Sequence, residues 1–175
     1  MNRPKMNAAL QTLDSLIGDP RQGLPEEIFL FASSITPMVN ADLLVRDDEG
    51  RILLSWRDDE HSGQGWHVPG GIVRFQETLE ERLQKTALRE FGSPVEFDPR
   101  PLEHVEFIER DHRERGHFVT FVYACRLPAG WNAASQPWKP GEAGYLAWHA
   151  AFPENMIQVH HYYRKYFPER SRACP

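Results

Sequence analysis

The segment Trp66–Gly92 constrains the fold most, because it combines a glycine turn, a capped helix and a glycine stop. Gly70–Gly71 closes an apolar segment, and two glycines allow backbone angles that other residues resist and let carbonyls approach a ligand closely. Thr78 and Glu81 have the spacing of a capping box. Gly92 supplies a left-handed helix stop. The segment therefore predicts a turn followed by an amphipathic helix, whose buried stripe is Leu79, Leu83, Ala87 and Phe91.

This segment resembles the Nudix box, the loop–helix–loop of hydrolases that cut nucleoside diphosphates linked to another group. Gly71, Glu77, Glu90 and Gly92 match the family pattern. Lys85 takes the place of an arginine, and we expect it to pair with Glu77. The resemblance implies an α/β fold, the Nudix α/β/α sandwich, with a mixed sheet and the loop–helix–loop motif.

Two positions depart from the family pattern, because Thr86 and Arg89 stand where the family usually has metal-binding glutamates. Their loss argues against a site for several metal ions, and Arg89 places a positive charge where extra cations would sit. Mg²⁺ is often held by one or two carboxylates plus substrate phosphates. The resemblance implies such a site at Gly70 and Glu90, with Glu77 as a further candidate ligand and Mn²⁺ able to substitute.

The residues upstream are similar to one branch of the family, the GDP-mannose mannosyl hydrolases. The stretch Thr36–Val45 is like the branch's strand with an aspartate, which here is Asp42. Arg57 has the branch's spacing from the glycine turn. The similarity is close over residues 36–92 and looser over 117–167. It implies attack of water at the sugar C1 with release of the nucleoside diphosphate, whereas other Nudix enzymes break a P–O bond.

Four residues are catalytic candidates by this resemblance. Arg57 matches an arginine that contacts the leaving group, although it could be a surface residue at a strand end. Asp42 is either a catalytic group or an ion-pair partner. His117 matches a histidine of the branch and could instead be a structural histidine. Glu142 takes the place of a metal-binding glutamine, and Ala143 takes that of the histidine base, so Glu142 is a candidate ligand, base or ordinary loop residue.

Several histidines are further candidates, and none has a partner spacing specific to a metal site. They are His112, His149 and the pair His160–His161.

Composition limits the classes of function. The 175 residues are 41% hydrophobic and 26% charged, as in a soluble globular domain, and the net charge of −5 argues against nucleic acid as a partner. We expect a helical arm at residues 1–35, a Nudix domain at 36–170 and a polar tail at 171–175. Two lone cysteines, no signal peptide and no run of ~20 apolar residues predict a cytoplasmic protein without a membrane partner. The arm would pack on the domain or on a second subunit, which leaves a homodimer open.

The order of elements follows from hydrophobic periodicity and turn residues. The expected helices cover residues 6–17, 28–34 and 153–167. The expected strands cover residues 38–46, 51–56, 101–110, 117–127 and 145–148, the second being the hairpin partner of the first. Residues 58–65 and 128–144 are expected to be loops.

Three functions remain open. The first is a Mg²⁺-dependent hydrolase of a nucleoside diphosphate sugar. The second is a Nudix pyrophosphatase that acts at phosphorus on another nucleoside diphosphate derivative. The third is a Nudix domain that binds a nucleotide without turnover, which the losses at Thr86, Arg89 and Ala143 favour and the retained Glu90 opposes.

Overall fold

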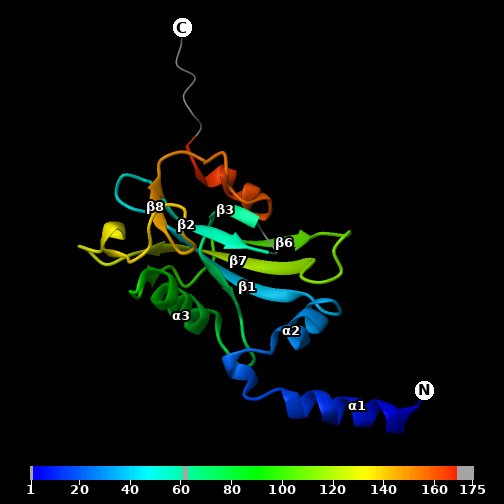
Figure 1. Ribbon diagram of the computed structural model, residues 1–175. Helices are drawn as coiled ribbons and strands as arrows, with labels where there is room; N and C mark the ends of the chain where they lie inside the picture. The colour runs from blue at the N-terminus through cyan, green and yellow to red at the C-terminus, as the bar shows by residue number, and fades with distance from the viewer. Residues whose placement is uncertain (1, 61–62, 169–175) are drawn as a thin grey trace.

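The computed structural model describes residues 2–60 and 63–168. It contains two sheets, with one long helix on one side and the C-terminal segment on the other (Figure 1). This is the α/β architecture with a mixed sheet that the sequence predicts. The expected polar tail, residues 171–175, lies outside the described residues.

The first sheet is built around two long parallel strands, β1 (Met38–Val45) and β7 (His117–Arg126). Strand β4 (Gly70–Ile72) pairs with β1 in antiparallel register, and this pairing places Gly70 opposite Asp42. The other edge is covered by strands antiparallel to β7, namely β5 (Glu96–Phe97) and β6 (Glu103–Ile108).

The second sheet has β2 (Ile52–Asp59) between β3 (Gly63–His67) and β8 (Leu146–His149). The prediction that β2 is the hairpin partner of β1 is wrong, because only one isolated bridge, Arg46 to Ile52, joins them. Both edges of β1 are already occupied by β4 and β7, so the chain passes into the other sheet. The expected loop at residues 58–65 is shorter than predicted, since strands reach Asp59 and resume at Gly63.

Helix α3 (Leu79–Phe91) has the predicted ends. Thr78 and Glu81 form a reciprocal capping box, and Gly92 ends the helix with φ 63°. The predicted stripe packs on the face of the first sheet formed by odd-numbered residues of β1 and β7. The fully buried members of the stripe are Leu83, Ala87 and Phe91. Their partners on the sheet include Leu43 and Tyr123.

The C-terminal segment is a 3₁₀-helix, η3 (Gln158–Tyr166), where the sequence predicts an α-helix over residues 153–167. Residues three apart lie one above another in a 3₁₀-helix. Aromatic residues at this spacing stack here, with ring centroids 5.2 Å apart for His160 and Tyr163 and 6.1 Å apart for Tyr163 and Tyr166. Tyr163 is fully buried as a result.

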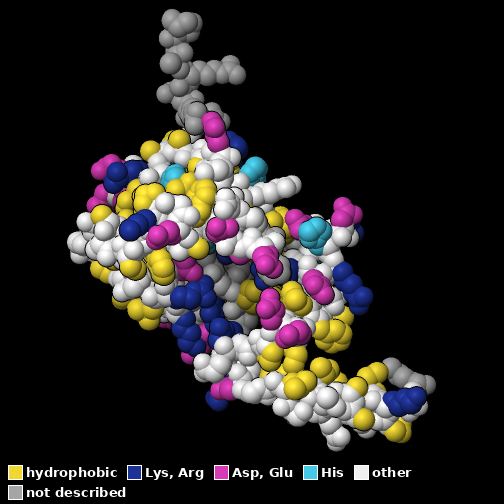
Figure 2. Space-filling model, in the orientation of Figure 1, with side chains coloured by type: hydrophobic (Ala, Val, Ile, Leu, Met, Phe, Trp, Pro, Cys, Tyr) yellow, Lys and Arg dark blue, Asp and Glu magenta, His cyan; other side chains and the backbone are white. Residues whose placement is uncertain are grey.

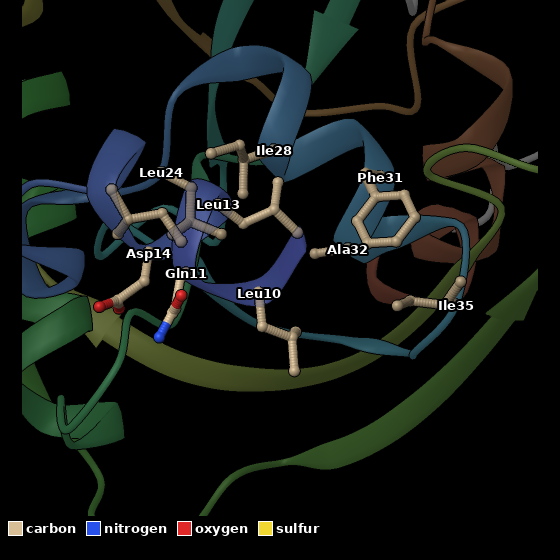
Figure 3. Close-up of a pocket in the computed structure, with 10 residues that line it drawn as sticks. Leu10, Gln11, Leu13, Asp14, Leu24, Ile28, Phe31, Ala32 and Ile35 are labelled. Atoms are coloured by element: carbon tan, nitrogen blue, oxygen red, sulfur yellow. The ribbon is translucent and has the colours of Figure 1, made fainter. Parts of the chain in front are cut away.

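The N-terminal segment consists of α1 (Arg3–Leu16), the short η1 (Pro20–Gln22) and α2 (Glu26–Ser33). Helix α2 lies near the end of β1, whereas α1 extends away from the sheets and has no buried residue (Figure 1). Apolar side chains of the two helices, with Ile35 just after α2, line a groove of about 560 Å³ (Figure 3); the helix residues include Leu10, Leu13, Ile28 and Phe31. In the described parts of the chain, no helix is long and apolar enough to cross a membrane.

Candidate active site

A cavity of about 790 Å³ lies where the even-numbered face of β1 meets the glycine turn, η3 and the N-terminal segment. Arginine side chains gather beside this hollow (Figure 2). Five arginines and four acids line it, although the whole chain carries a net charge of −5. The arginines are Arg57, Arg74, Arg82, Arg89 and Arg115, and the acids are Asp42, Glu60, Glu109 and Glu114.

Asp42 is a buried carboxylate at the base of this cavity, with an exposed fraction of 2%. Asn40 Nδ2 donates to its Oδ1 at 2.5 Å, and the Tyr163 hydroxyl donates to its Oδ2. Burial raises the pKa of Asp42 to about 7, against the lowering effects of these hydrogen bonds and of the charge on Arg57. The carboxyl therefore exchanges a proton near neutral pH.

Glycine is required in this turn because there is no room for a Cβ atom, and not because of an unusual backbone angle. Neither Gly70 nor Gly71 has a positive φ, contrary to the expectation that this turn needs angles other residues resist. A Cβ atom at Gly70 would lie 1.8 Å from Asp42 Oδ1, and one at Gly71 would lie 2.7 Å from Thr86 Oγ1. The turn therefore packs directly on the buried carboxylate on one side and on helix α3 on the other.

Glu77 is bound within the loop–helix motif. Its carboxylate is 3% exposed and forms ion pairs with Arg82 at 2.5 Å and Lys85 at 2.9 Å. It also accepts a hydrogen bond from the backbone N–H of Arg74 at 2.9 Å. The predicted pair with Lys85 is confirmed, and the buried Arg82 is a partner that the sequence did not indicate. These contacts make Glu77 an organiser of the loop.

Glu90 and the carbonyl of Gly70 converge on one cationic group, the guanidinium of Arg89. Arg89 Nη2 donates to Glu90 Oε1 at 2.8 Å and to Gly70 O at 3.3 Å. Arg89 Nε also donates to Glu90 Oε1, at 3.1 Å. Two oxygens within reach of one positively charged nitrogen make an arrangement that also suits a metal ion.

The donor set fits Mg²⁺ only as an open site. Over residues 2–60 and 63–168, no three His, Cys, Asp or Glu side chains are grouped so that they could hold a metal. Mg²⁺ needs fewer protein ligands when substrate phosphates and waters complete its shell. The oxygens of Gly70 and Glu90 fit that chemistry, since both already face a shared positive charge.

Arg57 lies on β2 and lines the same cavity as Asp42 and Gly70. Its Nε pairs with Asp59 at 3.3 Å, and its side chain is 28% exposed. The structure thus brings together the strand aspartate, the arginine and the glycine turn that the sequence singles out.

Two candidates lie elsewhere. Glu142 is exposed, and its Oε2 accepts a hydrogen bond from the backbone N–H of Lys139 at 2.9 Å, which closes a turn of its own loop. His117 opens β7, but the β7 residues that line the cavity are Phe118 and Thr120. Because side chains alternate along a strand, His117 points to the opposite face from Phe118.

The N-terminal segment forms a wall of the cavity that the sequence did not indicate. The backbone N–H of Arg115 donates to Ser33 Oγ at 2.9 Å, and its guanidinium lies 5.5 Å from the ring centroid of Phe29. A Cβ atom at Gly23 would lie 3.3 Å from the guanidinium carbon of Arg74. Both arginines are therefore held against residues 20–33.

Residues from η3 complete the site. His160 Nδ1 accepts a hydrogen bond from the backbone N–H of Val68 at 2.9 Å. Burial and the charge of Arg57 lower the pKa of His160 to about 3, so the ring is neutral at physiological pH. Tyr162 also lines the cavity, and burial together with the nearby charge of Asp42 raises the pKa of its hydroxyl. The three-residue spacing of His160, Tyr163 and Tyr166 was the available signal in the sequence, and it indicates core packing equally well.

Comparisons with known proteins place this geometry in a family. A family model described as NUDIX domain matches residues 36–167. The low-salt glycan biosynthesis protein Agl8 of Haloferax volcanii is 35% identical over 101 residues, which are 53% of this chain and 64% of the relative. The match therefore spans less than two thirds of that relative's length.

Solved structures share the fold. A MutT NUDIX hydrolase from Burkholderia pseudomallei has a TM-score of 0.62 and 24% identity, covering 76% of this chain and 99% of its own. A UDP-X diphosphatase has a TM-score of 0.54 and 20% identity, covering 74% of this chain and 59% of its own. At these identities the likeness concerns the fold alone.

We predict that Glu77→Gln destabilises the protein by about 3–5 kcal/mol, because it leaves the buried guanidinium of Arg82 without its countercharge. Urea unfolding followed by circular dichroism measures this change. Glu80→Gln, an exposed acid in the first turn of α3, is the matched control and should change stability by less than about 1 kcal/mol. Equal stability of the two variants would show that Arg82 does not depend on Glu77.

Proposed function

Since the chain belongs to the NUDIX domain family, we propose that it is a Mg²⁺-dependent hydrolase of a nucleoside diphosphate sugar of the GDP-mannose kind. The products would be the nucleoside diphosphate and the free sugar. The main support is the buried carboxylate of Asp42, which has a pKa near 7 and lies against the Gly70 turn in an arginine-lined cavity.

The cavity has the charge to hold a diphosphate. Arginine makes charge-assisted hydrogen bonds to phosphate oxygens, often two at once. Arg57 lies on β2 and Arg89 at the end of α3, so they would approach the diphosphate from two elements. When bound at Gly70 and Glu90, Mg²⁺ would neutralise charge that develops on the departing diphosphate.

Asp42 has the properties of a general base. Such a base works best when its pKa lies near the operating pH, and the pKa of Asp42 is raised to about 7. Asn40 and Tyr163 hold both carboxylate oxygens in place. In this proposal, a water attacks the sugar C1 and its proton passes to Asp42, while the C1–O electron pair leaves with the diphosphate. Glu142, the base that the resemblance implies, is not among the residues that line the cavity and serves below as the alternative to be tested.

The apolar end of the cavity suits the nucleoside. Phe29, Phe107 and Phe118 line it, and Arg115 lies against Phe29. Aromatic side chains and arginine planes stack well on nucleobases. The printed name of Agl8, a glycan biosynthesis protein, supports a sugar at the other end of the substrate. Because the match covers only 64% of Agl8, the identity of the sugar must be determined by experiment.

A pyrophosphatase that acts at phosphorus is the second candidate, supported by the fold shared with a UDP-X diphosphatase. Hydrolysis of a nucleotide-sugar panel with Mg²⁺ in ¹⁸O-water separates the two. We expect the label on the free sugar. Label on a phosphate would move the protein to the second candidate, and no turnover across the panel would favour a nucleotide-binding domain.

We predict that Arg57→Gln weakens binding of a nucleoside diphosphate about tenfold or more, because one charge-assisted contact is lost. Isothermal titration calorimetry with GDP in Mg²⁺ measures the change. Arg126→Gln, which removes an exposed arginine paired only loosely with Asp48 at 3.4 Å, is the charge-matched control. Equal affinities in the two variants would show that Arg57 is a structural or surface residue that does not bind the diphosphate.

Asp42→Asn should lower kcat by about 10²–10⁴-fold, the usual contribution of a general base. In the wild type, the base works when deprotonated, so activity should fall as pH drops below about 7. The exposed Asp48→Asn should keep both the rate and the pH profile. If Glu142→Gln removes the acidic limb of the profile and Asp42→Asn does not, the base is Glu142.

A further inference from the structure

Arg89 occupies the position that a metal ion would need. Its Nη2 lies 2.8 Å from Glu90 Oε1 and 3.3 Å from Gly70 O, the two oxygens to which the proposed function assigns Mg²⁺. A guanidinium and a divalent cation cannot both approach these oxygens, because like charges a few ångströms apart repel strongly. Either the arginine or the metal can hold them, but not both.

The ion pair of Arg89 with Glu90 is not a simple consequence of their adjacent positions in the helix. Neighbouring residues on a helix do not face each other, so Arg89 and Glu90 do not meet by helical geometry alone. Arg89 nevertheless bends round to place both Nε and Nη2 on Glu90 Oε1. The carboxylate is 17% exposed, whereas the arginine is 56% exposed. A largely exposed cation therefore neutralises a largely buried anion.

The position of Arg89 in the helix adds to this attraction. Arg89 lies in the last turn of α3, where the helix dipole is negative and stabilises positive charge. The cation thus interacts with the carboxylate, the Gly70 carbonyl and the end of the helix at the same time.

We infer that Arg89 is a displaceable cation that holds Glu90 and Gly70 O in the free protein and must leave before a divalent ion binds. A diphosphate supplies the alternative partner, because its oxygens accept charge-assisted hydrogen bonds from a guanidinium. Metal and diphosphate therefore bind together, and each weakens the hold of Arg89 for the other. This inference rests on the metal site of the proposed function and not on the bond that is cleaved.

The test is a Mn²⁺ titration followed by electron paramagnetic resonance, with and without GDP. Without GDP, Arg89→Ala should bind Mn²⁺ about tenfold more tightly than the wild type, because the competing cation is gone. Adding GDP should tighten Mn²⁺ binding much more in the wild type than in Arg89→Ala. Equal Mn²⁺ affinities of the two proteins without GDP would overturn the inference.

Two controls separate competition from general charge. Arg74→Ala removes a positive charge from the same cavity wall, where the guanidinium lies against Gly23 rather than Glu90. Its effect should be smaller than that of Arg89→Ala, because salt screens a charge that is not in direct contact with the carboxylate. The double change Arg89→Ala with Glu90→Gln should lose the gained affinity. An equal gain in Arg74→Ala, or a gain that survives Glu90→Gln, contradicts the inference.

Turnover is measured apart from metal binding. If no nucleotide sugar is hydrolysed but the Mn²⁺ titrations follow the expected pattern, the reaction proposed above fails and the role of Arg89 stands. If hydrolysis proceeds and Arg89→Ala binds Mn²⁺ like the wild type, only the role of Arg89 fails. Absence of Mn²⁺ binding in every variant, with and without GDP, overturns it as well.

Discussion

The close approach of Asp42 to Gly70 is the contact on which the site depends. Antiparallel pairing of β1 and β4 sets these residues opposite each other, and no side chain other than hydrogen fits at position 70. The same contact buries the carboxylate, which raises its pKa, and fixes the carbonyl of the turn beside the end of α3. One strand register therefore positions both the carboxyl group with the raised pKa and a candidate metal ligand.

Electrostatic pairing then keeps the parts in position. Glu77 joins the loop to α3 through Arg82 and Lys85, while Arg89 joins the turn to Glu90. The Glu77–Arg82 pair is buried, whereas the Arg89–Glu90 pair is partly exposed. The loop therefore keeps its internal ion pair when an anion approaches the exposed guanidinium of Arg89 at its edge.

The sequence predicted what depends on local spacing. The capping box, the glycine stop and the pair of Glu77 with Lys85 all lie within one short segment, and all are present. The mixed sheet and the family followed from the same motif. By contrast, Tyr163 bonds to Asp42 across 121 residues, and no periodicity reveals such a contact.

Other features of the structure could not be predicted from the sequence for related reasons. The departure of β2 into the second sheet depends on which strands already occupy the edges of β1, and that is a property of the whole fold. The burial of Arg82 and the 3₁₀ form of the last helix also follow from tertiary packing. Sequence resemblance singled out Asp42, Arg57 and Gly70, which line one cavity, but it had no information on the loop turn that Glu142 closes.

The wall formed by α2 lies outside the part of the chain that the family model matches. That match begins at residue 36, yet Phe29 lines the cavity and the Ser33 hydroxyl accepts a hydrogen bond from the backbone of Arg115. Substitutions in α2 would therefore reshape one side of the cavity while leaving the residues around Asp42 and the glycine turn as they are.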